Sequence, residues 1–337
     1  MTGTMQATAE VNAERCHRVG EALRPLRLKA DFYTRPYLNV FAPAETRFRM
    51  HFFAVAICHQ TYNLYHRELN LFGWDYLEYV FSALAKNDAR LLRPEYLLHC
   101  DTEQLAGELA AAFSYSGKPE DTTLDRLSER AGLMRDAASH LINTYQGEVG
   151  KIFEIAHNRL CGSYGLYWLL PEFETFADPQ QKKSTFLIKL LEEDGLVKIS
   201  DPGNFIPIMD YHMQRVLLRL GCVEVKHQGL RNKLLARETF QTDEPIRGLC
   251  IEAFKIIAGN SGHPVTKMND FFWSLGRSCC HETTLCSDGI CSKNPCTFTQ
   301  IVEAGTHDRC VFQDFRPGAA APAYRDLWQP VVETHYY

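Results

Sequence analysis

An aspartate at the mouth of an amphipathic segment is the first candidate for chemistry in this 337-residue chain. Residues 206–221 read IPIMDYHMQRVLLRLG, in which Asp210 follows an extended approach and precedes apolar residues at helical spacing. We expect Asp210 to be an N-cap or first-turn carboxylate, which the positive end of the helix dipole keeps ionised. The pattern alone leaves two interpretations open, a helix cap and a reactive carboxylate.

A lysine in the segment before it is the second candidate. Residues 179–191 read PQQKKSTFLIKLL, which predicts a helix with Asp178 as its cap and Pro179 in its first turn. Lys183 would act as a nucleophile only if its amine were deprotonated by burial or by a neighbouring cation such as Lys182. The ordinary alternative is a pair of surface lysines on an amphipathic helix.

These segments resemble the helix-hairpin-helix DNA glycosylase superfamily, the group of endonuclease III and the archaeal 8-oxoguanine glycosylases. The resemblance lies in Asp-x-His-x-x-Arg-Val from Asp210, and in the Lys183-Ser184 pair followed by Lys189 six residues on. It implies a catalytic role for Asp210, a catalytic amine at Lys183, and an all-α fold of two lobes with the active cleft between them. The chain departs from the family at residues 170–174, LPEFE, where most members carry a glycine-containing hairpin that holds a DNA phosphate.

Six of the twelve cysteines fall within the last sixty residues, a density that in an intracellular protein favours metal binding over disulfides. Four of them follow Gly276-Arg277 with the spacing C-x5-C-x4-C-x4-C, similar to the C-x6-C-x2-C-x5-C of iron-sulfur loops in endonuclease III relatives. The resemblance implies a structural 4Fe-4S cluster, while zinc and no metal remain alternatives because soft thiolates suit either metal. Cys279 or Cys280 would be the first ligand. The expected ligand set is Cys280, Cys286, Cys291 and Cys296.

An aromatic stretch over residues 48–86 is predicted to form two helices separated by a turn at 72–75. By position relative to the family fold, polar and aromatic residues here would line a pocket for an extruded base. The alternative is that its polar side chains are satisfied buried groups between helices. The candidate substrate-binding residues are His59, Gln60, Trp74 and Asp75.

Composition sets the remaining expectations. A 45% hydrophobic chain without a long apolar run or a signal-peptide segment is expected to be an intracellular, soluble protein that needs no membrane. A net charge of −5 argues against a broad non-specific nucleic-acid surface. We expect an N-terminal helical region contributing the base pocket (1–150), a helical catalytic region (151–265) and a cysteine-rich region (266–337) whose last part, 316–337, lies along the surface.

The implied function is a DNA N-glycosylase, with an associated lyase step open, that excises a damaged or modified and bulky base. Repair and defence against phage with modified DNA are both open contexts. One alternative is an N-glycosidase acting on a modified nucleoside or nucleotide in salvage, which the acidic charge and the missing hairpin glycines favour. The other is a non-catalytic, zinc-stabilised nucleic-acid-binding module. DNA is the expected partner, and no obligate protein partner is inferred.

Overall fold

A computed structural model describes residues 8–29, 36–288, 296–303, 309–314 and 322–337. The protein is mostly helical, which confirms the all-α prediction at this level. Its few strands form two short antiparallel pairs, β1 (Ala9–Val11) with β4 (Val223–Val225) and β2 (Tyr65–His66) with β3 (Leu71–Phe72). Within the described ranges, none of the helices has the length and apolar character needed to cross a membrane.

The chain divides into two compact units that are each discontinuous in sequence. One unit comprises Met1–Phe32 and Ile206–Glu333, and the other comprises Tyr33–Phe205 and Thr334–Tyr337. The N-terminal residues join the first unit because β1 pairs with β4, with Ala9 opposite Val225. The boundaries of these units differ from those of the three regions expected from the sequence. The reason is that contacts between residues far apart in the sequence, and not their order along the chain, determine which unit a residue belongs to.

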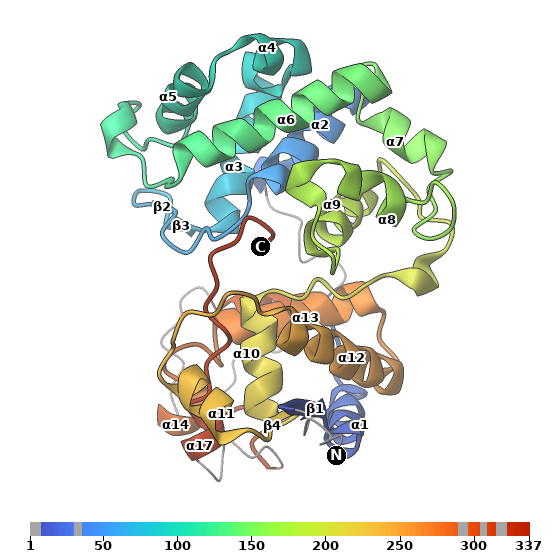
Figure 1. Ribbon diagram of the computed structural model, residues 1–337, viewed down its shortest axis with the longest axis vertical. Coiled ribbons are helices and arrows are strands. Elements are labelled where there is room, and N and C mark those ends of the chain that lie inside the picture. Colours follow the sequence, from blue (N-terminus) through green and yellow to red (C-terminus); the bar gives the residue numbers. More distant parts are fainter. Residues whose placement is uncertain (1–7, 30–35, 289–295, 304–308, 315–321) are drawn as a thin grey trace, which may run out of the picture. The chain divides into compact units, whose positions relative to one another are not determined.

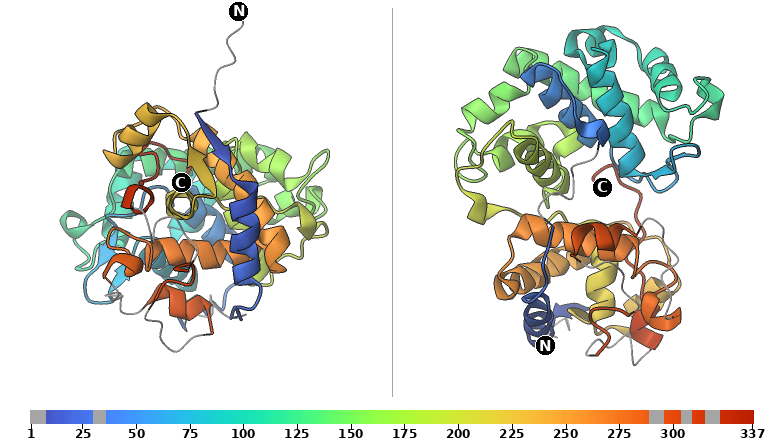
Figure 2. Two further views of the ribbon diagram at one scale, coloured as in Figure 1. Left: turned by 90° about the horizontal axis from the view of Figure 1, so that it is seen from below. Right: turned by 180° about the vertical axis from the view of Figure 1, so that it is seen from behind.

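In the first unit, α1 (Ala13–Leu23) lies along α12 (Glu244–Ser261), as the blue and orange ribbons show (Figure 2). α10 (Tyr211–Leu220) packs against α13 (Val265–Arg277) and also against α12, and α13 packs against α15 (Thr297–Ile301). The unit contains α1 (Ala13–Leu23), α10 (Tyr211–Leu220), α11 (Gln228–Leu235), α12 (Glu244–Ser261), α13 (Val265–Arg277), α14 (Leu285–Asp288), α15 (Thr297–Ile301) and α17 (Pro322–Arg325) (Figure 1).

In the second unit, the long helix α6 (Leu127–Tyr145) packs against α4 (Pro94–His99) and α5 (Thr102–Ala112). Helix α2 (Ala44–Ala56) packs against α3 (Trp74–Lys86) and α9 (Lys182–Glu193). Residues 57–73 between α2 and α3 are not helical and contain the β2–β3 hairpin, so the helical stretch predicted over 48–86 is broken further than the sequence indicated. The unit contains α2 (Ala44–Ala56), α3 (Trp74–Lys86), α4 (Pro94–His99), α5 (Thr102–Ala112), α6 (Leu127–Tyr145), α7 (Gly150–Ile155), α8 (Leu166–Leu169) and α9 (Lys182–Glu193) (Figure 1).

An aromatic core fixes the end of α2 against the residues before α9. The ring of Phe52 contacts those of Phe173 and Phe176 at centroid distances of 5.3 and 5.1 Å. This packing brings Thr175 to the last turn of α2, where its hydroxyl donates to the carbonyl oxygen of Ala56 at 2.6 Å. The carboxyl end of α2 and the start of α9 are therefore held together.

A close approach of α10 and α13 depends on Gly276. A Cβ atom at this position would lie 2.7 Å from the carbonyl oxygen of His212 and 2.9 Å from its Cβ. Only glycine therefore allows the two backbones to pack at this spacing.

We predict that Gly276→Ala lowers the free energy of unfolding by about 1–3 kcal/mol, because the helices must separate to fit a methyl group. Gly259→Ala is the matched control, since Gly259 is an exposed glycine of α12 with no atom within 4 Å of the added methyl group. The control should gain about 0.5–1 kcal/mol from helix propensity. Urea unfolding of both variants measures this, and equal effects of the two substitutions would contradict the packing argument.

Candidate functional site

Asp210 caps α10, as the sequence predicted. Its backbone is extended, with φ −106° and ψ −177°, and its Oδ1 accepts a hydrogen bond from the Met213 amide at 3.0 Å. The side chain of Asn269 holds the segment before Asp210 by accepting a hydrogen bond from the Ile208 amide at 3.1 Å. Asp210 is therefore a buried carboxylate at the positive end of a ten-residue helix.

Two buried arginines hold the far side of α10 in place. Arg215 donates to Gln329 Oε1 at 2.8 Å and to the Gly276 carbonyl at 2.9 Å, and its guanidinium lies 4.4 Å from the centre of the Trp328 ring. Arg219 donates to the carbonyl oxygens of Cys280 and Leu327 at 2.8 and 3.0 Å. These contacts fix the direction of α10 and thus of its cap.

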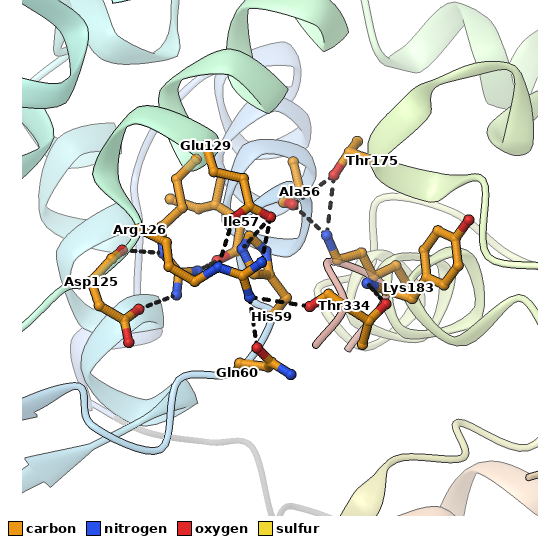
Figure 3. Close-up of polar contacts among 12 residues, drawn as sticks. Ala56, Ile57, His59, Gln60, Asp125, Arg126, Glu129, Thr175, Lys183 and Thr334 are labelled. Atoms are coloured by element: carbon orange, nitrogen blue, oxygen red, sulfur yellow. Dashed lines mark hydrogen bonds and ion pairs between the residues drawn. The ribbon is translucent and has the colours of Figure 1, made fainter. Parts of the chain in front are cut away.

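Lys183 is fully buried at the start of α9, in the second unit. Its Nζ donates to the Ala56 carbonyl oxygen at 2.5 Å and to Thr175 Oγ1 at 3.2 Å (Figure 3). A neutral amine has two N–H donors and one lone pair. Because both donors are used, the lone pair is left to act as a base or nucleophile.

The pKa of Lys183 is lowered to about 7, chiefly because burial disfavours its charged form. Charge on Cys58 opposes this effect, while Lys182 and Arg130 strengthen it. A large fraction of the amine is therefore neutral near physiological pH. The interpretation of Lys183 as a surface lysine was wrong.

The start of α9 differs from the prediction. The helix begins at Lys182, and its N-cap, Gln181, has the left-handed conformation with φ 60°. Asp178 still satisfies amides at this end, since its carboxylate accepts from Gln180 N at 3.0 Å and from Lys182 N at 2.8 Å. Pro179 consequently precedes the helix.

His59, one of the predicted pocket residues, is a fully buried side chain close to Lys183. Among the described residues, neither of its ring nitrogens has a hydrogen-bond partner. Its Nε2 lies 3.7 Å from Glu129 Oε1, but burial and the charges of Lys183 and Arg130 lower its pKa, so the ring is neutral. The alternative for this region was that its buried polar side chains are all hydrogen-bonded. His59 does not fit that alternative.

Gln60 lies beside it and is held by Arg126 of the turn before α6. The Arg126 guanidinium donates to Gln60 Oε1 at 2.6 Å and pairs with Glu129 through two hydrogen bonds of 2.6 and 2.8 Å (Figure 3). Gln60 and Arg126 both have positive φ, 46° and 52°, which is uncommon for residues with a side chain. This strained pair links the predicted pocket residues to α6.

Trp74 and Asp75 open α3. The Trp74 ring packs edge-on against Phe186 of α9 at 4.6 Å, and its buried Nε1 has no hydrogen-bond partner in the described part of the chain. The main-chain carbonyl of Asp75 accepts from the Tyr37 hydroxyl at 3.5 Å. The structure thus brings Trp74 into contact with α9, the helix that contains Lys183. The hydrogen bonds described for the Lys183 amine go to Ala56 and Thr175 and not to Asp75.

The segment Thr334–Tyr337 joins this site, and sequence reasoning missed it. Tyr337 is 4% exposed, and its carbonyl oxygen accepts from the Gln60 amide at 3.2 Å. Arg126 Nη1 donates to the Thr334 carbonyl at 3.3 Å (Figure 3). The prediction that 316–337 lies along the surface was wrong for this segment, and its two adjacent tyrosines were the available sequence signal for burial.

The expected metal ligands are described only in part, because Cys291 lies outside the described residues. Cys280 is buried, and Arg219 Nη1 approaches its Sγ at 3.6 Å. Cys286 Sγ lies 3.2 Å from Thr284 Oγ1. Across the described ranges, no three His, Cys, Asp or Glu side chains form a group that could hold a metal ion.

Comparison with known proteins adds no assignment: no protein-family model matches the chain, and no curated protein matches it significantly. The two residues singled out for chemistry belong to different compact units, Asp210 to the first and Lys183 to the second. His59, Gln60 and Trp74 belong to the unit of Lys183.

We predict that stability depends on the Lys183 amine. Its folded-state pKa of about 7 lies below the ordinary lysine value of 10.5, so the unfolded state binds more protons between these values and the free energy of unfolding rises with pH there. The slope is at most about 1.4 kcal/mol per pH unit. Lys183→Met should lack it, whereas Lys198→Met, at an exposed position, should keep it. Urea unfolding between pH 7 and 9.5 tests this, and parallel curves for wild type and Lys183→Met would contradict the burial of a titrating amine.

Proposed function

We propose that this protein is a DNA N-glycosylase that extrudes and excises a damaged or modified, bulky base, with Lys183 able to carry a subsequent lyase step. The observation that carries the proposal is the buried Lys183 amine with a pKa of about 7 and both N–H donors engaged. An amine prepared in this way is a nucleophile at neutral pH. A lysine needed only for charge or solubility would gain nothing from full burial.

In the proposed reaction, the Lys183 lone pair attacks C1′ of the sugar while the N-glycosidic bond breaks and its electron pair leaves with the base. The departing base takes up a proton, and the amine loses one. Opening of the sugar ring then gives an imine between Lys183 and C1′, from which β-elimination can cleave the strand. Thr175 and the Ala56 carbonyl orient the amine during the attack.

Asp210 has the complementary role in this proposal. As the base leaves, the sugar gains positive charge, and a carboxylate stabilises that charge more strongly in the transition state than in the ground state. The cap geometry fixes one carboxylate oxygen on the Met213 amide. A two-lobed arrangement, with the sugar in a cleft reached by Lys183 from one lobe and Asp210 from the other, is part of the proposal.

Recognition of the extruded base is assigned to the residues around Lys183. Trp74 offers an aromatic ring, and the neutral His59 offers one donor and one acceptor without a described hydrogen-bond partner. Such groups read the edge of a base that has left the duplex stack. Repair of a damaged base and removal of a modified phage base both fit this proposal.

A second candidate, an N-glycosidase acting on a modified nucleoside or nucleotide, is favoured by residues 170–177. Four amides there already donate within the chain, from Phe173, Phe176 and Ala177 to main-chain carbonyls and from Glu174 to Asp136 at 3.4 Å. They are therefore not available to hold a DNA phosphate as the family's glycine hairpin does. Comparing base release from a free modified nucleotide with release from an oligonucleotide decides between the two candidates.

The covalent route predicts a trapped complex. With oligonucleotides carrying a panel of damaged and modified bases, borohydride should reduce the imine and link the protein to the DNA strand that releases its base. Lys183→Ala should abolish this link, and mass spectrometry of the wild-type adduct should place it on residue 183. Base release without any trapped complex would limit Lys183 to positioning, and a trap that persists in Lys183→Ala would overturn its role.

Asp210→Asn separates capping from charge, because asparagine caps helices as well as aspartate. We predict that base release falls by about 100-fold or more while the free energy of unfolding changes by less than about 0.5 kcal/mol. The matched control is Asp101→Asn, which alters the N-cap of α5, where Oδ1 accepts from the Gln104 amide at 2.8 Å. Unchanged base release in Asp210→Asn would overturn the catalytic role of Asp210.

A 4Fe-4S cluster held by the cysteine loop is a separate part of the proposal, and no step of the reaction runs through it. Its support is the number and spacing of the cysteines and the cation at Cys280, since a guanidinium favours thiolate over thiol.

We predict that protein purified without oxygen is brown, absorbs near 400 nm and contains iron and acid-labile sulfide, all of which Cys280→Ala with Cys286→Ala removes. The control is Cys100→Ala, a buried cysteine of the other unit. Colourless protein with one zinc per chain would assign the loop to zinc, and protein without either metal would contradict the metal site.

A further inference from the structure

The segment Thr334–Tyr337 accepts hydrogen bonds from Gln60, a predicted base-binding residue, and from its neighbour Arg126. The Tyr337 carbonyl accepts from the Gln60 amide at 3.2 Å, and the Thr334 carbonyl accepts from Arg126 Nη1 at 3.3 Å. The same Arg126 nitrogen donates to Gln60 Oε1 at 2.6 Å. Two carbonyl oxygens of the segment are thus held by one pair of neighbouring donors.

The segment is close to the reactive amine as well as to Gln60. Burial is the main cause that lowers the pKa of both His335 and His59, and the charge of Lys183 adds to each shift, so the three side chains lie within electrostatic reach of one another. Tyr337 is buried although the residues that precede the segment, up to Glu333, belong to the other compact unit. Residues Thr334–Tyr337 therefore lie beside Gln60, Arg126 and Lys183 of the second unit.

The fit between the segment and the site is incomplete. His335 Nε2 is buried without a hydrogen-bond partner in the described residues, and both ring nitrogens of His59 are likewise unpaired. A segment that formed a permanent wall would be expected to satisfy such groups, because unpaired buried polar atoms destabilise a fold. Ordering these four residues costs conformational entropy, which lowers the free energy needed to release the two carbonyl contacts, the buried tyrosine and the hydrogen bond of His335 to the Glu174 backbone.

We propose that the main-chain amide of Gln60 and the guanidinium of Arg126 form a subsite for a planar ring that carries carbonyl oxygens. The segment Thr334–Tyr337 occupies this subsite until the ligand displaces it. The ligand part of this proposal rests on the proposed function, since it names the edge by which the base would be read. Two convergent donors select acceptor oxygens, such as the exocyclic carbonyl of an oxopurine, and leave His59 to pair with the remaining edge.

The occupancy is tested without any nucleic acid. Reductive methylation with formaldehyde and cyanoborohydride at pH 7.5, followed by peptide mass spectrometry, measures how fast the Lys183 amine is labelled. In the full chain, Tyr337→Ala should speed this labelling by about tenfold or more, because it removes the buried side chain of the segment. Tyr164→Ala, at an exposed tyrosine of the same unit, should leave the rate unchanged.

Two measurements separate release of the segment from unfolding. Lys189, buried on the same helix as Lys183, should keep its labelling rate in Tyr337→Ala. A synthetic Thr-His-Tyr-Tyr peptide in excess should restore protection of Lys183 in that variant. Unchanged or slower labelling of Lys183, or faster labelling of Lys189 alongside it, would overturn the displaceable segment.

The ligand class is tested with hypoxanthine, which carries a carbonyl at C6, against adenine, which carries an amino group there. Hypoxanthine should protect Lys183 from methylation in Tyr337→Ala at least fivefold better than adenine, and Arg126→Gln should remove the difference. Equal protection by the two bases would overturn the carbonyl-reading subsite. If these results hold while no substrate releases a base, the proposed glycosylase function fails and the subsite stands.

Discussion

Burial of a single amine is the constraint on which the candidate site depends. Lys183 lies in the first turn of α9, where the helix dipole adds to the cost of a positive charge that desolvation already disfavours. The aromatic packing of Phe52 with Phe173 and Phe176 maintains this position, because it sets Thr175 and the end of α2 against the amine. Burying Lys183 lowers the stability of the fold, and it leaves a large fraction of the amine neutral at neutral pH.

In the first unit, the start of a helix has the opposite effect on the charge of its side chain, the Asp210 carboxylate. Asp210 sits where the backbone favours negative charge, and its helix is anchored from behind by Arg215 and Arg219. The start of α9 therefore disfavours a positive charge on Lys183, and the start of α10 favours a negative charge on Asp210. A neutral amine and a carboxylate are the two groups that the proposed cleavage of an N-glycosidic bond would use.

Long-range contacts connect both units to distant parts of the sequence. The first residues join the unit of α10 through the β1–β4 pair, and Thr334–Tyr337 joins the unit of α9 through Gln60 and Arg126. Substitutions near residue 337 are thus expected to act on the surroundings of Lys183, although more than 150 residues separate them in the sequence.

The sequence by itself determined the helical class, the helix behind Asp210 and the capping role of that carboxylate, because apolar periodicity and N-cap chemistry act over a few neighbouring residues. It identified Lys183 only through a resemblance, and it misplaced the start of α9, where Gln181 takes a left-handed conformation that no local pattern required. The burial of Lys183, the lack of a hydrogen-bond partner for His59 among the described residues and the burial of Tyr337 were decided by the tertiary structure alone. Lys183 meets the Ala56 carbonyl, 127 residues away in the sequence, and Tyr337 meets Gln60, and no local propensity encodes which of these residues will meet.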